Sequence, residues 1–99
     1  MNKPVLKLYN KDQKLIKAMQ LLGDKNRYLI FKLILTNKEL CVSEIAGQLD
    51  VSIPAVSQYF KMFELVGLVE RNRMGQKICY ELKENDPFVK QLVEFIQTK

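Results

Sequence analysis

Two short helices that follow each other closely restrict the fold of this chain more than any other feature. Ser43 precedes a predicted helix over 44–49, and Ser52 precedes a second predicted helix over 53–65. A serine hydroxyl at such a position accepts a hydrogen bond from a free backbone amide of the first turn, so both serines are expected to be N-caps. Two short helices joined by about three residues are typical of a helix-turn-helix, which we predict over 43–65.

The second of these helices is predicted to have one apolar and one polar face. Pro54 falls in its first turn, where the missing amide hydrogen of proline costs least, and Gly67 is placed to end it. The polar residues Ser57, Gln58 and Lys61 lie between the apolar ones. The apolar residues recur at i, i+4 and i+7, the spacing of a face that packs on a core: Val56, Phe60 and Phe63.

A β-hairpin is predicted directly after the helix pair. Residues 68–73 lead into a turn at Met74-Gly75, and residues 76–82 lead out of it. Gly75 provides the conformational freedom that a hairpin tip needs. The second run alternates with the period of a strand that has one face in water: Ile78, Tyr80 and Leu82 against Lys77, Cys79 and Glu81. We call residues 68–82 the wing.

The remaining segments are predicted to form three helices and one short extended segment. Apolar spacing predicts helices over 11–22 and 25–37, and residues 40–42 are expected to be extended. A last helix is predicted over 86–98, with Asp86 as its N-cap.

The order helix, helix, strand, helix, turn, helix, hairpin, helix is that of a winged helix-turn-helix. This is a mainly α fold with a small β-hairpin. A chain of 99 residues has the length of a single domain. We expect a single domain over 11–99, preceded by an N-terminal arm over 1–10.

The composition excludes several classes of function. The chain has no histidine, which removes Ser-His and Cys-His catalysis and every histidine-ligated metal site. We find no nucleophile–base pair and predict neither an enzyme nor a cofactor. No apolar run approaches the roughly 18 residues of a membrane span, and the first residues do not resemble a signal peptide. Two cysteines are too few for a disulfide scaffold, so we expect a cytoplasmic protein.

The net charge of +5 is unevenly distributed. Residues 1–38 hold nine basic and two acidic groups, a balance of +7, whereas residues 39–66 have a balance of −3 and residues 67–99 of +1. Clustered basic residues favour a polyanionic partner, although a solvated lysine-rich surface has the same composition. The negative balance of the middle segment favours an alternative, a winged-helix protein-interaction module that does not bind DNA.

The polar face of the 53–65 helix has residue types that read DNA. Glutamine pairs with adenine through two hydrogen bonds, serine reaches phosphates or bases, and lysine reaches phosphate or guanine. The basic residues of the wing are placed to follow the backbone or to enter a minor groove. We predict contacts to double-stranded DNA from nine residues: Ser52, Ile53, Pro54, Ser57, Gln58, Lys61, Arg71, Arg73 and Lys77.

Four segments resemble, in order, the motifs of one family. Residues 22–27 (LGDKNR) resemble its lad-ptR opening, and residues 39–46 (ELCVSEIA) resemble its ELcVceLA segment. Residues 52–63 (SIPAVSQYFKMF) are similar to its SqstVSrHLkvL recognition helix, and residues 67–82 contain its aGLV…G…vyYrL pattern. The resemblance covers about residues 15–83 and is to the ArsR/SmtB-type transcriptional regulators.

This resemblance implies a homodimeric repressor whose terminal helices form the interface and whose release from DNA is controlled by a chemical signal. Two recognition helices about 34 Å apart predict an inverted-repeat operator. Metal-sensing relatives carry Cys-Val-Cys where this chain has Ser43 in place of the second cysteine, and the last helix offers only Asp86 and Glu94. We therefore predict no metal site, and the sequence does not identify an inducer.

The first and last predicted helices are richer in apolar residues than one side of a monomer core requires. We predict that these residues form the dimer interface: Leu15, Ile16, Met19, Phe88, Leu92, Phe95 and Ile96.

The two cysteines are candidates for a redox pair. In winged helices, the strand before the helix pair often pairs with the second hairpin strand. If Leu40 and Val42 face inward, Cys41 faces outward, and the same alternation turns Cys79 outward. The two thiols are then cross-strand neighbours, and a bond between them would tie the wing to the helix-turn-helix. The alternative is two unrelated small side chains that fill space in a reducing cytoplasm.

Overall fold

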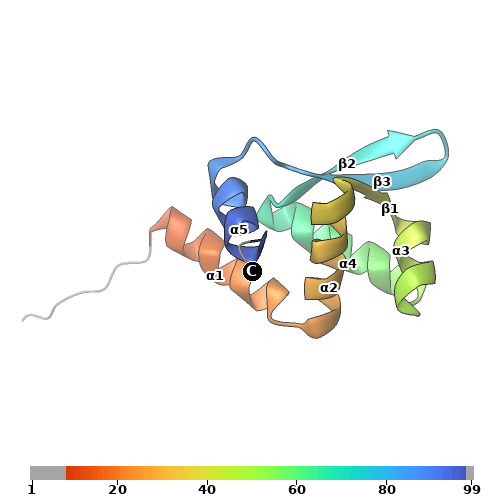
Figure 1. The fold of residues 1–99 in the computed structure, drawn as a ribbon, viewed down its shortest axis with the longest axis horizontal. Coiled ribbons are helices and arrows are strands. Elements are labelled where there is room, and N and C mark those ends of the chain that lie inside the picture. Colours follow the sequence, from red (N-terminus) through yellow and green to blue (C-terminus); the bar gives the residue numbers. More distant parts are fainter. Residues whose placement is uncertain (1–8, 98–99) are drawn as a thin grey trace, which may run out of the picture.

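The computed structural model describes residues 9–97 of the chain. Residues 1–8, most of the predicted arm, and residues 98–99 lie outside that part, and Asn10 of the predicted arm belongs to the first helix. The elements are α1 (Asn10–Leu22), α2 (Lys25–Asn37), β1 (Glu39–Cys41), α3 (Val42–Leu49), α4 (Ile53–Val66), β2 (Val69–Met74), β3 (Lys77–Leu82) and α5 (Pro87–Gln97). This is the predicted winged helix-turn-helix order, mainly helical with a small antiparallel sheet (Figure 1).

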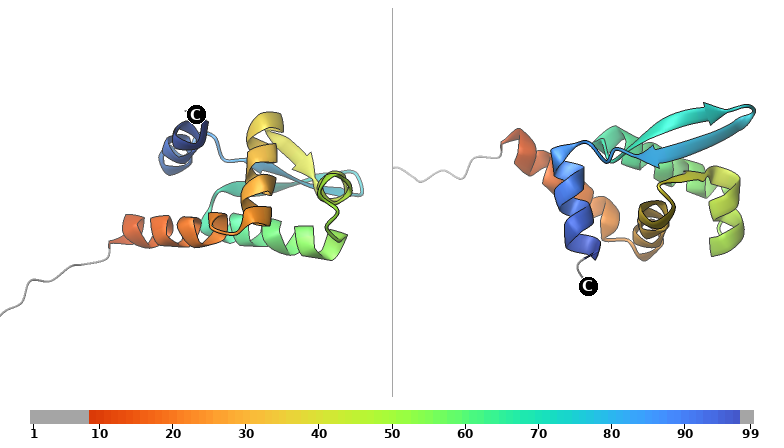
Figure 2. Two further views of the ribbon diagram at one scale, coloured as in Figure 1. Left: turned by 60° about the horizontal axis from the view of Figure 1, so that its bottom comes forward. Right: turned by 45° about the horizontal axis from the view of Figure 1, so that its top comes forward.

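The described elements divide between two ends of the molecule. Figures 1 and 2 show α3, the start of α4 and the tip of the hairpin at one end, and α1 and α5 at the other. The three strands form one antiparallel sheet in the order β1-β3-β2, so β3 is its central strand. Within residues 9–97, no helix combines the length and the apolarity needed to cross a membrane.

Aromatic side chains from three elements form the centre of the core. The ring of Phe31 in α2 lies 5.7 Å from that of Phe63 in α4, centre to centre. Phe63 lies 6.0 Å from Phe60 of the same helix, and Phe60 stacks on Tyr80 of β3 at 4.6 Å. All four side chains are buried. The core therefore holds α4 between α2 and the central strand.

The connection between α1 and α2 is fixed by Arg27 and Asp24. The Asp24 carboxylate caps α2 by accepting from the backbone N–H of Arg27 at 3.1 Å. The Arg27 guanidinium reaches back to α1, where its Nε donates to the carbonyl of Leu21 at 2.8 Å, and it lies 6.0 Å from the ring centre of Tyr59 in α4. The segment that resembles a family motif thus joins three helices.

The start of α3 differs from the prediction. The helix begins at Val42, so Cys41 is the N-cap and Ser43 already lies in the first turn, where it is exposed. The side chain of Glu44 explains the shift, because its Oε1 accepts from the backbone N–H of Cys41 at 3.0 Å. A carboxylate at the third helical position can accept a hydrogen bond from the backbone N–H of the N-cap residue. A prediction based on serine N-caps alone does not take this interaction into account.

Asp86 caps α5, as predicted, and also connects this helix to α1. Its Oδ1 accepts from the backbone N–H groups of Phe88 at 2.8 Å and Val89 at 3.2 Å. Lys14 of α1 donates to Oδ2 at 3.4 Å and lies 5.1 Å from the ring centre of Phe88. Burial opposes ionisation, but the hydrogen bonds from Val89, Lys14 and Phe88 outweigh it and lower the pKa of Asp86.

Replacing Asp86 by alanine is expected to lower the free energy of unfolding at pH 7 by about 1 kcal/mol, because α5 loses its N-cap. Asp86→Asn is the matched control, since asparagine keeps the cap and removes only the charge. A lowered native pKa stabilises the fold above the unfolded pKa of about 3.9, and this contribution is lost as the pH falls through the native pKa. In urea titrations, the stability gap between wild type and Asp86→Asn should narrow towards low pH, and a constant gap would contradict this assignment.

Candidate nucleic-acid interface

Helix α4 begins and ends with the predicted caps. The Ser52 hydroxyl accepts from the backbone N–H of Ala55 at 3.2 Å, and Pro54 lies in the first turn. At the other end, Gly67 adopts a left-handed conformation with φ 88°, and its N–H reaches the carbonyl of Phe63 at 3.1 Å. The sequence itself therefore fixes the length of this helix.

The two faces of α4 have opposite environments. Val56, Phe60 and Phe63 are fully buried, as their spacing predicts. Gln58 and Lys61 are exposed and Ser57 is half-buried. The first residues of the helix also face solvent: Ser52, Ile53 and Pro54 are exposed. The predicted reading face is thus accessible, and the aromatic residues behind it hold it in place.

The hairpin turn lies one residue further along the chain than predicted. Met74 ends β2 and pairs with Lys77, which leaves Gly75 and Gln76 as the two residues of the turn. Gly75 has φ 65°, a conformation that glycine adopts without strain. Gln76 is exposed at the tip, and it was not among the predicted contact residues. If the hairpin had been assigned a two-residue turn that begins at Gly75, the sequence would have identified Gln76 as a tip residue.

The three basic residues of the wing are exposed but lie on different faces. Arg71 is opposite Tyr80 and Arg73 is opposite Ile78, so both share the face on which α4 packs. Lys77 lies on the other face, one step along β3. The positive charge therefore surrounds the hairpin tip and does not form a single flat patch.

The stack of Phe60 on Tyr80 joins the reading helix to the wing. The two rings are nearly parallel, with an interplanar angle of 3°. Burial and the charge of Glu64 raise the pKa of the Tyr80 phenol, and the neighbouring Arg71 offsets only part of this rise. Tyr80 is therefore neutral at physiological pH, and a buried apolar contact connects the two parts of the surface.

A hollow of about 290 Å³ separates the first residues of α4 from the wing. We call it the HTH–wing notch. It brings together three predicted contact residues, Ile53, Ser57 and Lys77, which are distant in the sequence. Its other lining residues are Cys41, Val42, Ser43, Gln76 and Ile78. The notch shows that the helix and the wing form one continuous surface.

The outer face of the sheet is acidic near the base of the wing. Glu39, Glu81 and Glu70 stand side by side across the three strands. The side-chain amide of Asn72 donates to Glu39 Oε2 at 3.3 Å and to Glu81 Oε1. Two of these carboxylates thus share one neutral donor, and the row remains negatively charged.

Cys41 and Cys79 are cross-strand partners, as the sheet register predicted, and the structure joins them by a disulfide. One part of the expectation was wrong. Cys79 does not face water, because it lies on the central strand between Cys41 and Asn72 and is fully buried. Cys41 on the edge strand is half-buried.

The predicted dimer residues separate into exposed and buried groups. Met19 and Phe95 are 64% and 79% exposed, and Leu15 and Ile16 are also exposed. Phe88 and Leu92 are half-buried and pack partly on the protein's own core. Ile96 was wrongly assigned: it is 6% exposed, because it lies on the inner side of α5.

A hollow of about 460 Å³ lies on the exposed side of α1 and α5, and we call its apolar lining the α1–α5 face: Leu15, Met19, Phe88, Leu92 and Phe95. The lining also contains Lys11, Asp12 and Gln91. This face is at the opposite end of the molecule from the hairpin tip (Figure 1). It is thus separate from the predicted DNA-reading surface.

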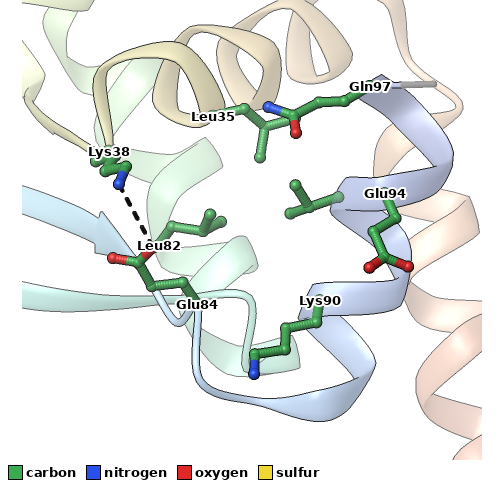
Figure 3. Close-up of a pocket in the computed structure, with 8 residues that line it drawn as sticks. Leu35, Lys38, Leu82, Glu84, Lys90, Glu94 and Gln97 are labelled. Atoms are coloured by element: carbon green, nitrogen blue, oxygen red, sulfur yellow. Dashed lines mark ion pairs between the residues drawn. The ribbon is translucent and has the colours of Figure 1, made fainter. Parts of the chain in front are cut away.

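A further hollow of about 440 Å³ lies between α5, the end of α2 and the end of β3 (Figure 3). Leu35, Leu82 and Val93 form its apolar part, while Lys38 pairs with Glu84 at 3.9 Å at its edge. The side chains in this hollow have charges of both signs, and it contains no residue predicted to contact DNA. Its presence shows that α5 is not packed tightly against α2 along its whole length.

An accessible polar helix face beside a basic hairpin tip, held by one buried aromatic core, defines a DNA-binding regulator of the winged helix-turn-helix class. Residues 24–71 match the model of the bacterial regulatory protein family arsR. The cadmium resistance transcriptional regulatory protein CadC of Listeria innocua is 29% identical over 83 residues, which are 83% of this chain and 70% of that protein. The uncharacterized HTH-type regulator MJ1325 of Methanocaldococcus jannaschii is 27% identical over 88 residues, 89% of this chain and 93% of that protein.

Solved structures agree with these sequence matches. HlyU from Vibrio cholerae superposes with a TM-score of 0.75 at 25% identity, covering 88% of this chain and 91% of HlyU. The homodimeric winged helix-turn-helix DNA-binding domain of Mb0332 from Mycobacterium bovis superposes with a TM-score of 0.75 at 23% identity. The match covers 98% of this chain and 87% of the Mb0332 domain. The family match over residues 24–71, the similarity to CadC and these shared folds confirm the resemblance to ArsR-type transcriptional regulators seen in the sequence.

The name of CadC raises the question of a metal site in this chain. Soft divalent metals need several thiolate or imidazole ligands. Cys41 and Cys79 are bonded to each other, and within residues 9–97 no three histidine, cysteine, aspartate or glutamate side chains are grouped so that they could hold a metal ion. The described residues therefore do not fit such a site.

The opposite environments of Phe60 and Gln58 predict opposite effects on stability. Phe60→Ala is expected to cost about 3–5 kcal/mol of unfolding free energy, because it leaves a cavity beside Tyr80 and Phe63. Gln58→Ala, two residues away, should change stability by less than about 0.5 kcal/mol. Urea unfolding followed by circular dichroism measures both, and a large loss for Gln58→Ala would show that this side chain is packed.

Proposed function

We propose that the chain is a homodimeric repressor that binds an inverted-repeat operator in double-stranded DNA. The observation that carries the proposal is the exposure of Gln58 and Lys61 on a helix whose opposite face is fully buried. A helix supported in this way enters a major groove without rearrangement of its own core. Gln58 is assigned to an adenine edge, and Ser57 and Lys61 to phosphates or neighbouring bases.

The other predicted contacts position the duplex. Ser52, Ile53 and Pro54 approach the backbone at the start of α4, and Arg71, Arg73 and Lys77 bind phosphates around the wing tip. Gln76 joins this group because it lines the HTH–wing notch together with Ile53, Ser57 and Lys77. These roles require no catalytic group, so the proposed function is not enzymatic. We place the protein in the cytoplasm, together with the duplex DNA that it binds.

The α1–α5 face supports the homodimer. An exposed phenylalanine and methionine next to a hollow in a small domain are typical of a partner surface. The Lys14–Asp86 contact fixes α1 and α5 relative to each other, so one rigid patch is presented. A two-fold axis through this patch leaves the first turns of both reading helices free, because they lie at the other end of each protomer (Figure 1).

The rival function, a protein-interaction module that does not bind DNA, rested on the negative charge of residues 39–66. The structure gives three of those four acidic residues local roles. Glu44 accepts from the N-cap amide of α3, Glu39 accepts from Asn72, and Asp50 takes the left-handed position that ends α3. These three residues thus have roles within the fold itself, which weakens the support for the rival.

Gln58→Ala and Arg73→Ala should weaken DNA binding in different ways. For duplexes selected from a random pool, Gln58→Ala is expected to cost roughly 1–3 kcal/mol at one base position and to relax selectivity there. Arg73→Ala should weaken selected and random duplexes alike and reduce the salt slope by about one. Lys90→Ala, which removes a lysine on α5, is the control and should change neither. Fluorescence anisotropy across a salt series measures all three, and binding that does not depend on salt would contradict the proposal.

Phe95→Asp should convert the dimer to a monomer and weaken operator binding, because each particle then reads only one half-site. Phe95 is chosen over Leu92 because it is exposed and its replacement leaves the protein's own core intact. Phe95→Leu keeps the surface apolar and should remain dimeric. Size-exclusion chromatography with light scattering gives the mass, and a Phe95→Asp dimer would place the interface elsewhere.

A further inference from the structure

The Cys41–Cys79 disulfide connects the helix-turn-helix to the wing at one point. Cys41 is the last residue of β1 and the N-cap of α3. Cys79 lies in the central strand β3, which forms the second half of the wing. The bond closes a sequence separation of 38 residues, a segment that includes all of α3, α4 and β2. Both parts of the proposed DNA surface therefore lie within or next to one covalent loop.

The disulfide also borders the DNA-reading surface. Cys41 lines the HTH–wing notch together with Ile53 and Ser57 of α4 and Lys77 of the wing. The width of this notch depends on how β3 is held against the start of α3. Apart from the disulfide, β1 and β3 are joined by the pairing of three residues on each strand and by the hydrogen bond from the Leu82 N–H to the Lys38 carbonyl. The covalent bond therefore adds a direct constraint between the wing and the start of α3, beside the Phe60–Tyr80 stack that holds the wing on α4.

The two sulfur atoms differ in access to solvent. Cys79 is fully buried, whereas Cys41 on the edge strand is half-buried and borders the notch. A small thiol or disulfide in solution can therefore reach only Cys41. Reaction is expected to begin at Cys41 and to be completed by Cys79.

We propose that Cys41 and Cys79 form a thiol–disulfide exchange site for low-molecular-weight disulfides, and that its oxidised form binds the operator more tightly. The Cys41 thiolate attacks a small disulfide, a mixed disulfide forms at Cys41, and one small thiolate leaves. The Cys79 thiol then loses its proton and attacks the Cys41 sulfur, which releases the second small thiol. Two protein thiols are oxidised to one disulfide, and one small disulfide is reduced to two thiols.

The effect on DNA binding follows from preorganisation, and it rests on the proposed function. In the disulfide form, the wing and α4 are held in a single arrangement around the notch. In the dithiol form, the wing keeps its backbone pairing and the Phe60–Tyr80 stack but loses the covalent link to the start of α3, so binding must also restrict the motion that this link prevented. We expect the dithiol form to bind a selected duplex at least about fivefold more weakly, the lower end of the coupling typical of two linked sites.

The 99-residue chain tests this directly, because it contains two cysteines and every thiol measured in it belongs to this pair. One sample is reduced with a phosphine and another is oxidised with glutathione disulfide. Intact mass and thiol titration give the state of the pair, and anisotropy gives the affinity for a selected duplex at fixed salt. Tighter binding by the oxidised sample is expected. Equal affinities, tighter binding by the reduced sample, or two thiols that persist in glutathione disulfide would overturn the proposal.

Three variants separate the roles of the two cysteines. Cys79→Ala should accumulate a glutathione adduct on Cys41, whereas Cys41→Ser, which keeps a capping side chain, should form none on the buried Cys79. The cysteine-free double variant Cys41→Ser/Cys79→Ala should bind like the reduced wild type and ignore the oxidant. A response of the double variant, or an adduct on Cys79, contradicts the proposed exchange. If no sample binds any duplex, the proposed function fails instead, and the thiol titration still reports on exchange.

Discussion

The contact between Phe60 and Tyr80 is the interaction on which the rest of the structure depends. It places an aromatic residue of α4 directly on the central strand of the sheet, so the reading helix and the wing share one buried surface. Phe63 and Phe31 extend this contact to α2. Removal of water from these four rings supplies the driving force, and their parallel or tilted geometry fixes how α4 lies. The accessible residues of α4 are positioned as a result.

Most of the fold could be predicted from the sequence, because its signals are local. Ser52, Gly67 and Asp86 end or begin helices by hydrogen bonds to nearby backbone groups, and the structure contains all three caps. The spacing of Val56, Phe60 and Phe63 identified the buried face of α4. The predicted DNA-reading face was assigned from the polar residues Ser57, Gln58 and Lys61 between these apolar positions, and Gln58 and Lys61 are exposed in the structure.

The predictions that were wrong concern residues whose environment depends on a further side chain, strand or helix. Serine statistics favoured Ser43 as a cap, but Glu44 satisfies the Cys41 amide and starts α3 earlier. Alternation placed Cys79 on an outer face, which is correct, yet a central strand has neighbours on both sides that exclude water. Ile96 belongs to the core because α5 turns that side inward. None of these outcomes is encoded in spacing alone, since each depends on packing between elements distant in the sequence.

The wing is acidic at its base and basic near its tip. Glu39, Glu81 and Glu70 repel a phosphate backbone, while Arg73 and Lys77 beside the turn attract it. An approaching duplex therefore experiences a torque that turns it towards the end of the hairpin. This uneven charge along one hairpin favours approach of a duplex at the end of the wing over approach at the base of the sheet.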